Sequence, residues 1–247
     1  MTAIPGDPST ASRTATSAVT ELATLAGGLA HEIRNPLSVF NLNVELLIED
    51  FENPESTRDR RVLQRLKLLE KECQHLERIL NDFLEFVRAG SLALETTDLN
   101  DVVRELAEYF QPQFQEARIE ISPHLGGNLP GVQLDRRLFR QALINLVQNA
   151  RQAMPNGGVL ELQTYLQDDR VVLEVIDTGQ GMDERTQAKM FDAFYSTKQN
   201  GSGLGLPTVR RIVESHGGTI ACASEPGRGT RFTIALPPAS LTSPQHD

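Results

Sequence analysis

The chain has 247 residues, 39% of them hydrophobic and 23% charged, which is the composition of an ordinary globular protein. A formal net charge of −9 and an isoelectric point near 5.1 argue against a broad surface for nucleic acid or anionic membrane, because such surfaces need clustered positive charge. The sequence shows no run of about 18 apolar residues and no secretory signal pattern, so we expect no membrane span. Cys73 and Cys222 lie far apart without zinc-like spacing, which predicts reduced thiols in the cytoplasm.

The N-terminal part is predicted to be a tail followed by a helical hairpin. Residues 1–18 carry almost no large apolar side chains, which predicts a disordered tail or linker. Apolar residues then recur at alternating steps of four and three over 26–51 and again over 62–87, a spacing typical of helices about 25 residues long. Asn53 and Pro54 lie between the two runs and favour a turn. We therefore expect an antiparallel hairpin over residues 19–90.

The apolar ladders of the two helices are too long for one hairpin to cover. Two helices of roughly 37 Å, packed only on each other, would leave much of their apolar surface in water. Pairing two hairpins into a four-helix bundle removes this exposure, so the sequence predicts a homodimer. The ladders are Ala26, Ala30, Ile33, Leu37, Phe40, Val44, Leu47 and Phe51, then Val62, Leu66, Leu69, Cys73, Leu76, Leu80, Phe83 and Val87.

The C-terminal part, residues 98–238, alternates helices and strands and predicts a second domain. Helices are expected over 98–114, over 135–154 with Asp135 as N-cap, and over 207–216, where Gly217 and Gly218 end the helix. Strands are expected over 117–122, 159–166, 171–176, 219–224 and 230–236, with a hairpin turn at 167–170. The predicted fold class is thus α + α/β: a hairpin, then an α/β sandwich of mostly antiparallel sheet, then a tail over 239–247.

A histidine on the first predicted helix is the candidate nucleophile. On a helical wheel with its seam between Ala30 and Ile33, His31 points about 130° away from the seam and Asn35 points nearly opposite to it, so both face solvent. A neutral imidazole is a competent nucleophile near pH 7, and Glu32 is placed to orient it and accept its other proton. An exposed histidine on a helix is usually inert, so its role depends on the neighbouring motifs.

Three strings in the C-terminal part are candidates for a nucleotide site. Asn145 and Asn149 lie one turn apart on a helix, and an amide oxygen suits Mg²⁺ that bridges phosphates. Asp177 ends a strand in Asp-Thr-Gly-Gln-Gly-Met, where a buried carboxylate can accept a hydrogen bond from the amine of adenine and repel the carbonyl of guanine. The third string, 201–206, reads Gly-Ser-Gly-Leu-Gly-Leu and leads into a helix N-terminus, a site suited to phosphates.

Taken together and in this order, these strings resemble the boxes of sensor histidine kinases. His-Glu-Ile-Arg-Asn-Pro over 31–36 resembles the phosphoacceptor box, and the later strings, with the Phe-x-x-Phe stretch that starts at Phe191, resemble the N, G1, F and G2 boxes of the ATP-binding domain. The resemblance implies catalytic roles for His31, Glu32 and Asn35. It also implies ATP and Mg²⁺ as cofactors, Asn149 as the Mg²⁺ ligand, and an ATP site formed by Asn145, Asn149, Ala153, Asp177, Gly179, Gly181, Met182, Lys198, Gly201, Ser202, Gly203, Leu204, Gly205, Leu206 and Thr230.

The resemblance further implies phosphoryl transfer from His31 to an aspartate of a response regulator, with dephosphorylation of that regulator as a second activity. Phe-Tyr-Ser-Thr-Lys over 194–198, followed by Gly-Leu-Gly-Leu-Pro-Thr-Val over 203–209, is most similar to the nitrogen-regulation type of kinase. Only about 20 residues precede the first helix, where the family has a sensory or aligning domain. We therefore expect either a separate sensory partner or a chain that is a fragment of a longer sensor.

Other classes share parts of this pattern. The Hsp90, gyrase and MutL ATPases place a Glu one turn before the Asn that binds Mg²⁺, where it activates water. Asn145 occupies that position here and cannot take a proton, which disfavours rapid hydrolysis. A bundle scaffold or a degenerate kinase would need no intact motifs, and a protein-serine kinase of the same nucleotide fold would lack the His-Glu box.

Overall fold

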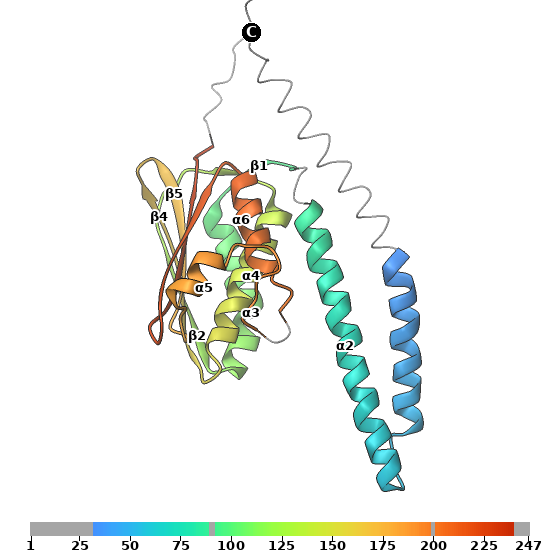
Figure 1. Ribbon diagram of the computed structural model, residues 1–247. Helices are drawn as coiled ribbons and strands as arrows, with labels where there is room; N and C mark the ends of the chain where they lie inside the picture. Colours follow the sequence, from blue (N-terminus) through green and yellow to red (C-terminus); the bar gives the residue numbers. More distant parts are fainter. Residues whose placement is uncertain (1–31, 89–91, 199–200, 240–247) are drawn as a thin grey trace, which may run out of the picture. The chain divides into compact units, whose positions relative to one another are not determined.

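The computed structural model describes residues 32–88, 92–198 and 201–239, which fall into two compact units. The first unit contains the chain up to Gly90 together with Lys198–Leu204, and the second contains Ser91–Thr197 and Gly205–Asp247. Figure 1 shows the first as a pair of long helices and the second as a sheet with helices.

The first unit is the expected antiparallel hairpin. A helix over 32–50 is followed by a turn and by α2 (Thr57–Arg88). Ser56 starts α2 with a reciprocal cap, because its Oγ accepts the Asp59 N–H at 3.1 Å and the Asp59 carboxylate accepts the Ser56 N–H at 2.9 Å. Arg34 donates to the Asn81 side chain at 2.9 Å and joins the two helices far from the turn. Ala26 and Ala30 of the predicted first ladder lie outside the described residues.

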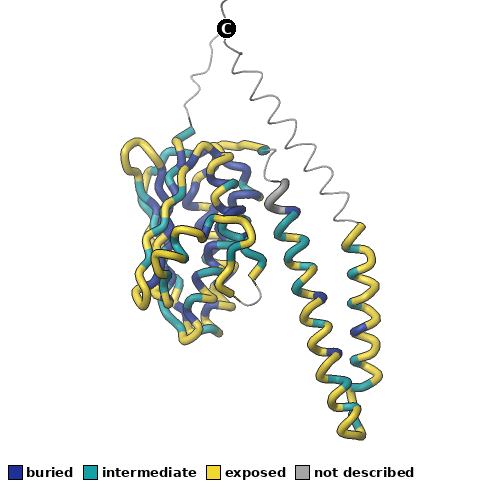
Figure 2. The backbone as a smooth tube through the Cα atoms, in the orientation of Figure 1, coloured by how far each residue is buried: buried dark blue, intermediate teal, exposed yellow. Residues whose placement is uncertain are grey.

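Each predicted ladder divides into a covered half and an exposed half. Val44, Leu66 and Cys73 are buried between the two helices, whereas other ladder residues remain open to solvent. The tube in Figure 2 accordingly shows only short buried stretches along the hairpin. The exposed ladder residues, which are 44–52% accessible, are Ile33, Phe40, Leu47, Leu69 and Leu76.

The second unit is an α/β sandwich built on a five-stranded sheet in the order β2-β4-β5-β7-β6. The strands are β2 (Ile119–Leu125), β4 (Gly158–Gln167), β5 (Arg170–Asp177), β6 (Thr219–Glu225) and β7 (Gly229–Leu236). β2 runs parallel to β4 and every other neighbouring pair is antiparallel, so the mostly antiparallel sheet is confirmed. The helices α3 (Leu99–Glu116), α4 (Arg136–Ala153) and α6 (Gly205–Ser215) cover one face of this sheet (Figure 1).

Apolar side chains from the helices and from the covered face of the sheet make the core of this unit. Leu160, Leu173 and Ile234 come from three adjacent strands and are fully buried, as is Phe139 of α4. Burying one such side chain contributes about 1.5–3 kcal/mol, so this layer stabilises the frame on which the candidate site is held. Alternate residues of β4 face the other way and are less buried, as the period of two requires.

The predicted helix starts are confirmed at two aspartates. Asp98 accepts the Asn100 N–H and caps α3, while Asp135 accepts the Leu138 N–H at 3.0 Å and caps α4. Asp135 also accepts the Ala93 N–H at 3.1 Å, which fixes the incoming chain to the start of α4. The backbone N–H of Asp135 in turn donates to Nε2 of His216, whose Nδ1 bonds the Ile212 carbonyl.

Several short elements differ from the sequence prediction. The strand expected over 117–122 begins only at Ile119, because α3 continues through Pro112 and the chain turns at Arg118 with φ 58°. The three-residue strands β1 (Glu95–Thr97) and β3 (Val132–Leu134) pair with each other, and α5 (Glu184–Lys189) is a short helix. The predicted turn at 167–170 is confirmed, with Asp168 and Asp169 in the left-handed conformation that a two-residue hairpin requires. Within the described ranges every helix is too short or too polar to cross a lipid bilayer.

Replacing Asp135 tests the role of the helix cap. Burial opposes the charge of this carboxyl, but the N–H groups of Leu138 and Ala93 hold its pKa below the usual value. This contribution to stability is therefore present above the pKa of the unfolded state and is lost as the pH falls through the folded-state pKa. We expect Asp135→Ala to lower the free energy of unfolding by about 1 kcal/mol at pH 7.

The measurement is urea unfolding followed by circular dichroism at several acidic and neutral pH values. Asp135→Asn is the matched control, since Asn is an equally good cap but does not titrate. It should keep most of the stability at pH 7 and lose the acid dependence. Equal stability of Asp135→Ala and the unchanged chain would contradict the capping role.

Candidate active site

A buried carboxylate at the end of β5 is the centre of the candidate site. Asp177 is 5% exposed and lies directly opposite Thr230 of β7, which is 6% exposed. Asp177 Oδ1 accepts the N–H of Gly179 at 2.9 Å, so the carboxylate is fixed by the loop that follows the strand. The structure thus brings together Asp177, Gly179 and Thr230, which the sequence resemblance assigns to one ATP site.

The loop after β5 needs its glycines because other backbone lies in contact with it. A Cβ on Gly179 would lie 2.7 Å from the carbonyl oxygen of Ala153, and a Cβ on Gly181 would lie 1.9 Å from that of Glu225. Gly181 also has φ 67°, which side chains rarely adopt. The N–H of Gln180 donates to the Ala153 carbonyl at 3.0 Å, which places Ala153, at the end of α4, against the loop.

Two residues that the sequence analysis missed hold the other side of this loop. Met182 donates its N–H to Ser224 Oγ at 2.8 Å. Gln187 Nε2 donates to the carbonyls of Met182 and Ser224, at 3.1 and 2.8 Å. Ser224 lies on the same face of β6 as Ile220 and Cys222. A polar residue in a row of otherwise apolar positions was the one sign in the sequence that Ser224 has a special role.

The thiol of Cys222, which is affected by the charge of Asp177, is not reactive at neutral pH. Cys222 lies on β6, and burial followed by the charge of Asp177 raises its pKa to about 12. A thiol with this pKa stays protonated at neutral pH and is a poor nucleophile or metal ligand. Cys73 is buried in the hairpin, and burial together with the charge of Glu77 raises its pKa as well. Both cysteines are free, as expected.

The first of the two candidate asparagines of α4, Asn145, lies toward the start of α6. Asn145 and Asn149 are both partly buried, and Asn145 Oδ1 lies 3.5 Å from the position of a Cβ on Gly205, the first residue of α6. The amide oxygen of Asn145 and the first residue of α6 are therefore neighbours here. Such a pair suits a phosphate chain with a hard cation.

The remaining predicted residues are divided between the two units. Lys198 and Gly201–Leu204 belong to the unit of the hairpin, where Ser202 Oγ donates to Asp82 Oδ2 at 2.5 Å. Gly205 and Leu206 open α6 in the other unit. Glu32 and Asn35 are exposed on the first helix, whereas His31 lies outside the described residues.

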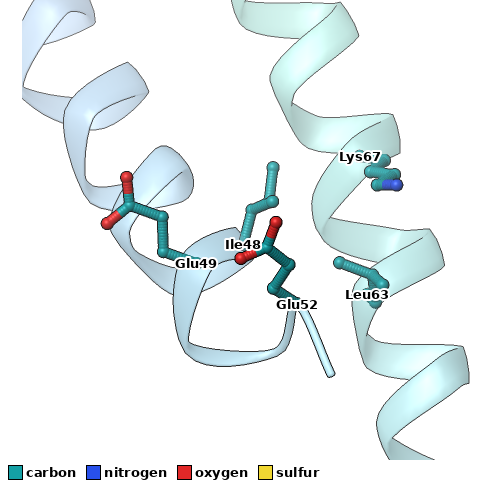
Figure 3. Close-up of a pocket in the computed structure, with 5 residues that line it drawn as sticks. All are labelled: Ile48, Glu49, Glu52, Leu63 and Lys67. Carbon is teal, nitrogen blue, oxygen red and sulfur yellow. The ribbon is translucent and has the colours of Figure 1, made fainter. Parts of the chain in front are cut away.

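A cavity near the hairpin turn contains none of the predicted site residues. It has a volume of about 420 Å³ and is lined by Ile48, Glu49, Glu52, Leu63 and Lys67 (Figure 3). Its lining combines two apolar side chains, Ile48 and Leu63, with three charged ones. Because its lining contains none of the candidate nucleotide residues and it lies at the end of the hairpin, it is a poor candidate for the nucleotide site.

A helical hairpin followed by an α/β sandwich, in which a buried aspartate ends a strand ahead of two glycines, defines the class of histidine kinases. Residues 21–92 match the family described as His Kinase A (phospho-acceptor) domain. Residues 134–240 match the family described as Histidine kinase-, DNA gyrase B-, and HSP90-like ATPase. The chain thus contains, in this order, the phosphoacceptor and ATP-binding domains of a two-component sensor kinase.

Individual relatives agree with this assignment. The signal transduction histidine-protein kinase AtoS of Escherichia coli (strain K12) is 34% identical over 217 residues, which are 87% of this chain and 35% of AtoS. Full-length ShkA in complex with AMPPNP is 30% identical with a TM-score of 0.68, covering 90% of this chain and 47% of ShkA. ThkA in complex with the response regulator protein TrrA is 25% identical with a TM-score of 0.64, covering 92% of this chain and 65% of ThkA. The chain spans 34–45% of the length of the curated relatives.

Replacing Gly179 tests the close approach of the loop to α4. A methyl group at this position meets the Ala153 carbonyl and Asp177 Oδ1 at 2.7 and 2.8 Å, so Gly179→Ala must displace the loop or the carboxylate. We expect ATP affinity to fall at least tenfold in calorimetric titrations. Gly127→Ala is the matched control, because a Cβ there meets no atom within 4 Å. Unchanged ATP affinity in Gly179→Ala would show that this contact does not shape the base pocket.

Proposed function

We propose that this chain is an ATP-dependent protein histidine autokinase that phosphorylates His31 and passes the phosphoryl group to an aspartate of a response regulator. The observation that carries the proposal is the wall of Asp177, Gly179 and Thr230, found in a chain whose phosphoacceptor match includes His31. The kinase relatives and the AMPPNP complex of ShkA support ATP as the phosphoryl donor.

The proposed ATP site is formed by the loop after β5, the start of α6 and residues of α4. Asp177 accepts a hydrogen bond from the adenine amine, while Gly179, Gly181 and Met182 let the backbone approach the base. The start of α6 provides N–H groups for the phosphates. The sequence motif assigns the string over 201–206 and Lys198 to phosphate binding as well. Ala153 and Asn145 line the side formed by α4.

The residues present also fit a magnesium ion. Asn149 offers a neutral amide oxygen beside the proposed phosphate site, which matches the preference of Mg²⁺ for hard oxygen ligands. Among the described residues no group of three or more His, Cys, Asp or Glu side chains could hold a metal by itself. The phosphates and water must therefore supply most ligands, and the ion would neutralise phosphate charge during transfer.

The reaction is a displacement at the terminal phosphorus. A ring nitrogen of His31 forms the new N–P bond, the bond from phosphorus to the ADP oxygen breaks, and Glu32 takes up the ring proton. Asn145 stands where the related ATPases have a general base, so this chain has no carboxylate there to activate water. The phosphoryl group is consequently kept for the histidine.

The outward face of the first helix is the proposed docking site for the response regulator. Val39, Leu42 and Leu46 are 50–61% exposed and follow one another at three- and four-residue steps on the side of the helix that carries Asn35. An exposed aliphatic row of this kind is typical of a protein contact. We also propose that Asn35 assists dephosphorylation of the regulator, since its side chain is exposed and it follows His31 by four residues in the sequence.

A second copy of the chain is proposed to cover the exposed half of the ladders. A helix in a four-helix bundle packs against two neighbouring helices, so its apolar stripe is wider than the strip that a single neighbour covers. On both helices of this hairpin the exposed ladder residues lie on the same side of the seam, as antiparallel geometry allows. Ile33, Phe40 and Leu47 therefore adjoin Leu69 and Leu76 in one continuous apolar face.

We propose two finer features from the sequence motifs. The string over 194–198 and the string over 203–209 support the nitrogen-regulation-like subtype. Because the curated relatives extend well beyond the region matched here, a sensory domain or a separate sensory partner is proposed to control the kinase.

The His31 assignment is tested by autophosphorylation. The chain is incubated with ATP labelled on its γ-phosphate, and the protein-bound label should survive base and be lost in acid, as a phosphoramidate does. His31→Gln should bind ATP normally but abolish this label. His124→Gln, which removes an exposed histidine from β2, is the control and should label like the unchanged chain. Acid-labile label on His31→Gln would reject the assignment.

The dimer face is tested by introducing one charge. Leu69→Glu places two carboxylates, one from each copy, in the proposed interface, so we expect dimer affinity to fall at least hundredfold in analytical ultracentrifugation. Leu68→Glu is the matched control, because Leu68 is 60% exposed but points away from that face. Equal effects of the two substitutions would contradict the proposed face.

A further inference from the structure

The wall of Asp177, Gly179 and Thr230 is called the base wall. The hydroxyl of Ser224 joins the three segments around it. Its oxygen accepts the N–H of Met182 at 2.8 Å, from the loop after β5. The same hydroxyl donates to the carbonyl oxygen of Gly229 at 2.8 Å and lies 3.0 Å from the Thr230 hydroxyl, both on β7. Ser224 itself is on β6, so one small side chain connects two strands and the loop.

Counting protons fixes the direction of each of these bonds. A serine hydroxyl has one proton to donate and two lone pairs that accept. The Gly229 carbonyl can only accept, so the Ser224 proton is used there. The Met182 N–H occupies one lone pair of Ser224. The bond between Ser224 and Thr230 must therefore run from the Thr230 proton to the remaining lone pair of Ser224.

This assignment leaves Thr230 as an acceptor. Its one proton points to Ser224, and its two lone pairs receive no hydrogen bond from any residue that the structure describes. Thr230 lies opposite Asp177 in the antiparallel pair of β5 and β7, and both side chains are at least 94% buried. An ionised carboxylate also only accepts. The base wall thus presents acceptors and no side-chain donor at this register.

We propose that Ser224 is a specificity-determining positioning residue that holds the Thr230 hydroxyl as an acceptor. The wall then selects a purine with an amine at C6, such as adenine, over one with a carbonyl at C6, such as guanine. The proposal rests on the proposed function as an ATP site. An amine offers hydrogens to both Asp177 and Thr230, whereas the carbonyl of guanine meets only acceptors. Without Ser224, the Thr230 hydroxyl is free to turn its proton toward that carbonyl.

The test is calorimetric titration of the full chain with MgATP and with MgGTP. In Ser224→Ala we expect the preference for ATP over GTP to narrow about tenfold, because GTP gains a donor while ATP loses an acceptor. Ser224→Thr is the matched control, since it keeps the hydroxyl and should keep the preference. Equal weakening of both nucleotides in Ser224→Ala, or the same narrowing in Ser224→Thr, would overturn the proposal.

Thr230→Val gives a second measurement that leaves the Ser224 contacts to Met182 and Gly229 in place. It removes the acceptor, so ATP affinity should fall while GTP affinity does not fall. A loss shared by both nucleotides would count against the proposal. Failure of this proposal can be told apart from failure of the proposed function. If the unchanged chain labels His31 and prefers ATP, and Ser224→Ala shows the same preference, only the role of Ser224 is rejected. An unchanged chain that binds no ATP removes both.

Discussion

The hydrogen bond from the Gly179 N–H to the carboxylate of Asp177 is the constraint on which the base wall depends. It fixes a charged group at the end of a central strand, opposite Thr230 and against the end of α4. The backbone around it is so close that glycine is required at positions 179 and 181. The two glycines therefore serve the carboxylate as much as the loop, because a bulkier residue would displace the group that we propose to contact the base.

The chemistry of the chain is divided between two units. The hairpin carries the box around His31, and the sandwich carries the base wall and the asparagines of α4. Asn145 replaces a carboxylate that would activate water, so the sandwich can hold a nucleotide without a built-in route to hydrolysis. A division of this kind suits the proposed kinase, whose acceptor is a side chain of one unit and whose proposed base pocket is in the other.

The sequence predicted most of the fold because local signals agreed with tertiary structure. The helix start near Asp98, the cap at Asp135, the turn at 168–169 and the mostly antiparallel sheet all follow from patterns within a few residues. The strands β1 and β3 could not be predicted, since each is three residues long and its partner is about 37 residues away. Ser224 was missed for a similar reason: its bonds reach residues that are distant in sequence and visible only once the strands are aligned. The ladders predicted the bundle, but the division into covered and exposed halves appears only in the structure.

The carboxylate of Asp135 accepts two backbone N–H groups, one from Leu138 at the start of α4 and one from Ala93, just before β1. Loss of its charge weakens both bonds at once, so the first turn of α4 and the entry of the chain into the sandwich should loosen together as the pH falls through the folded-state pKa of Asp135. A single proton thus acts on two segments that are about 40 residues apart in the sequence.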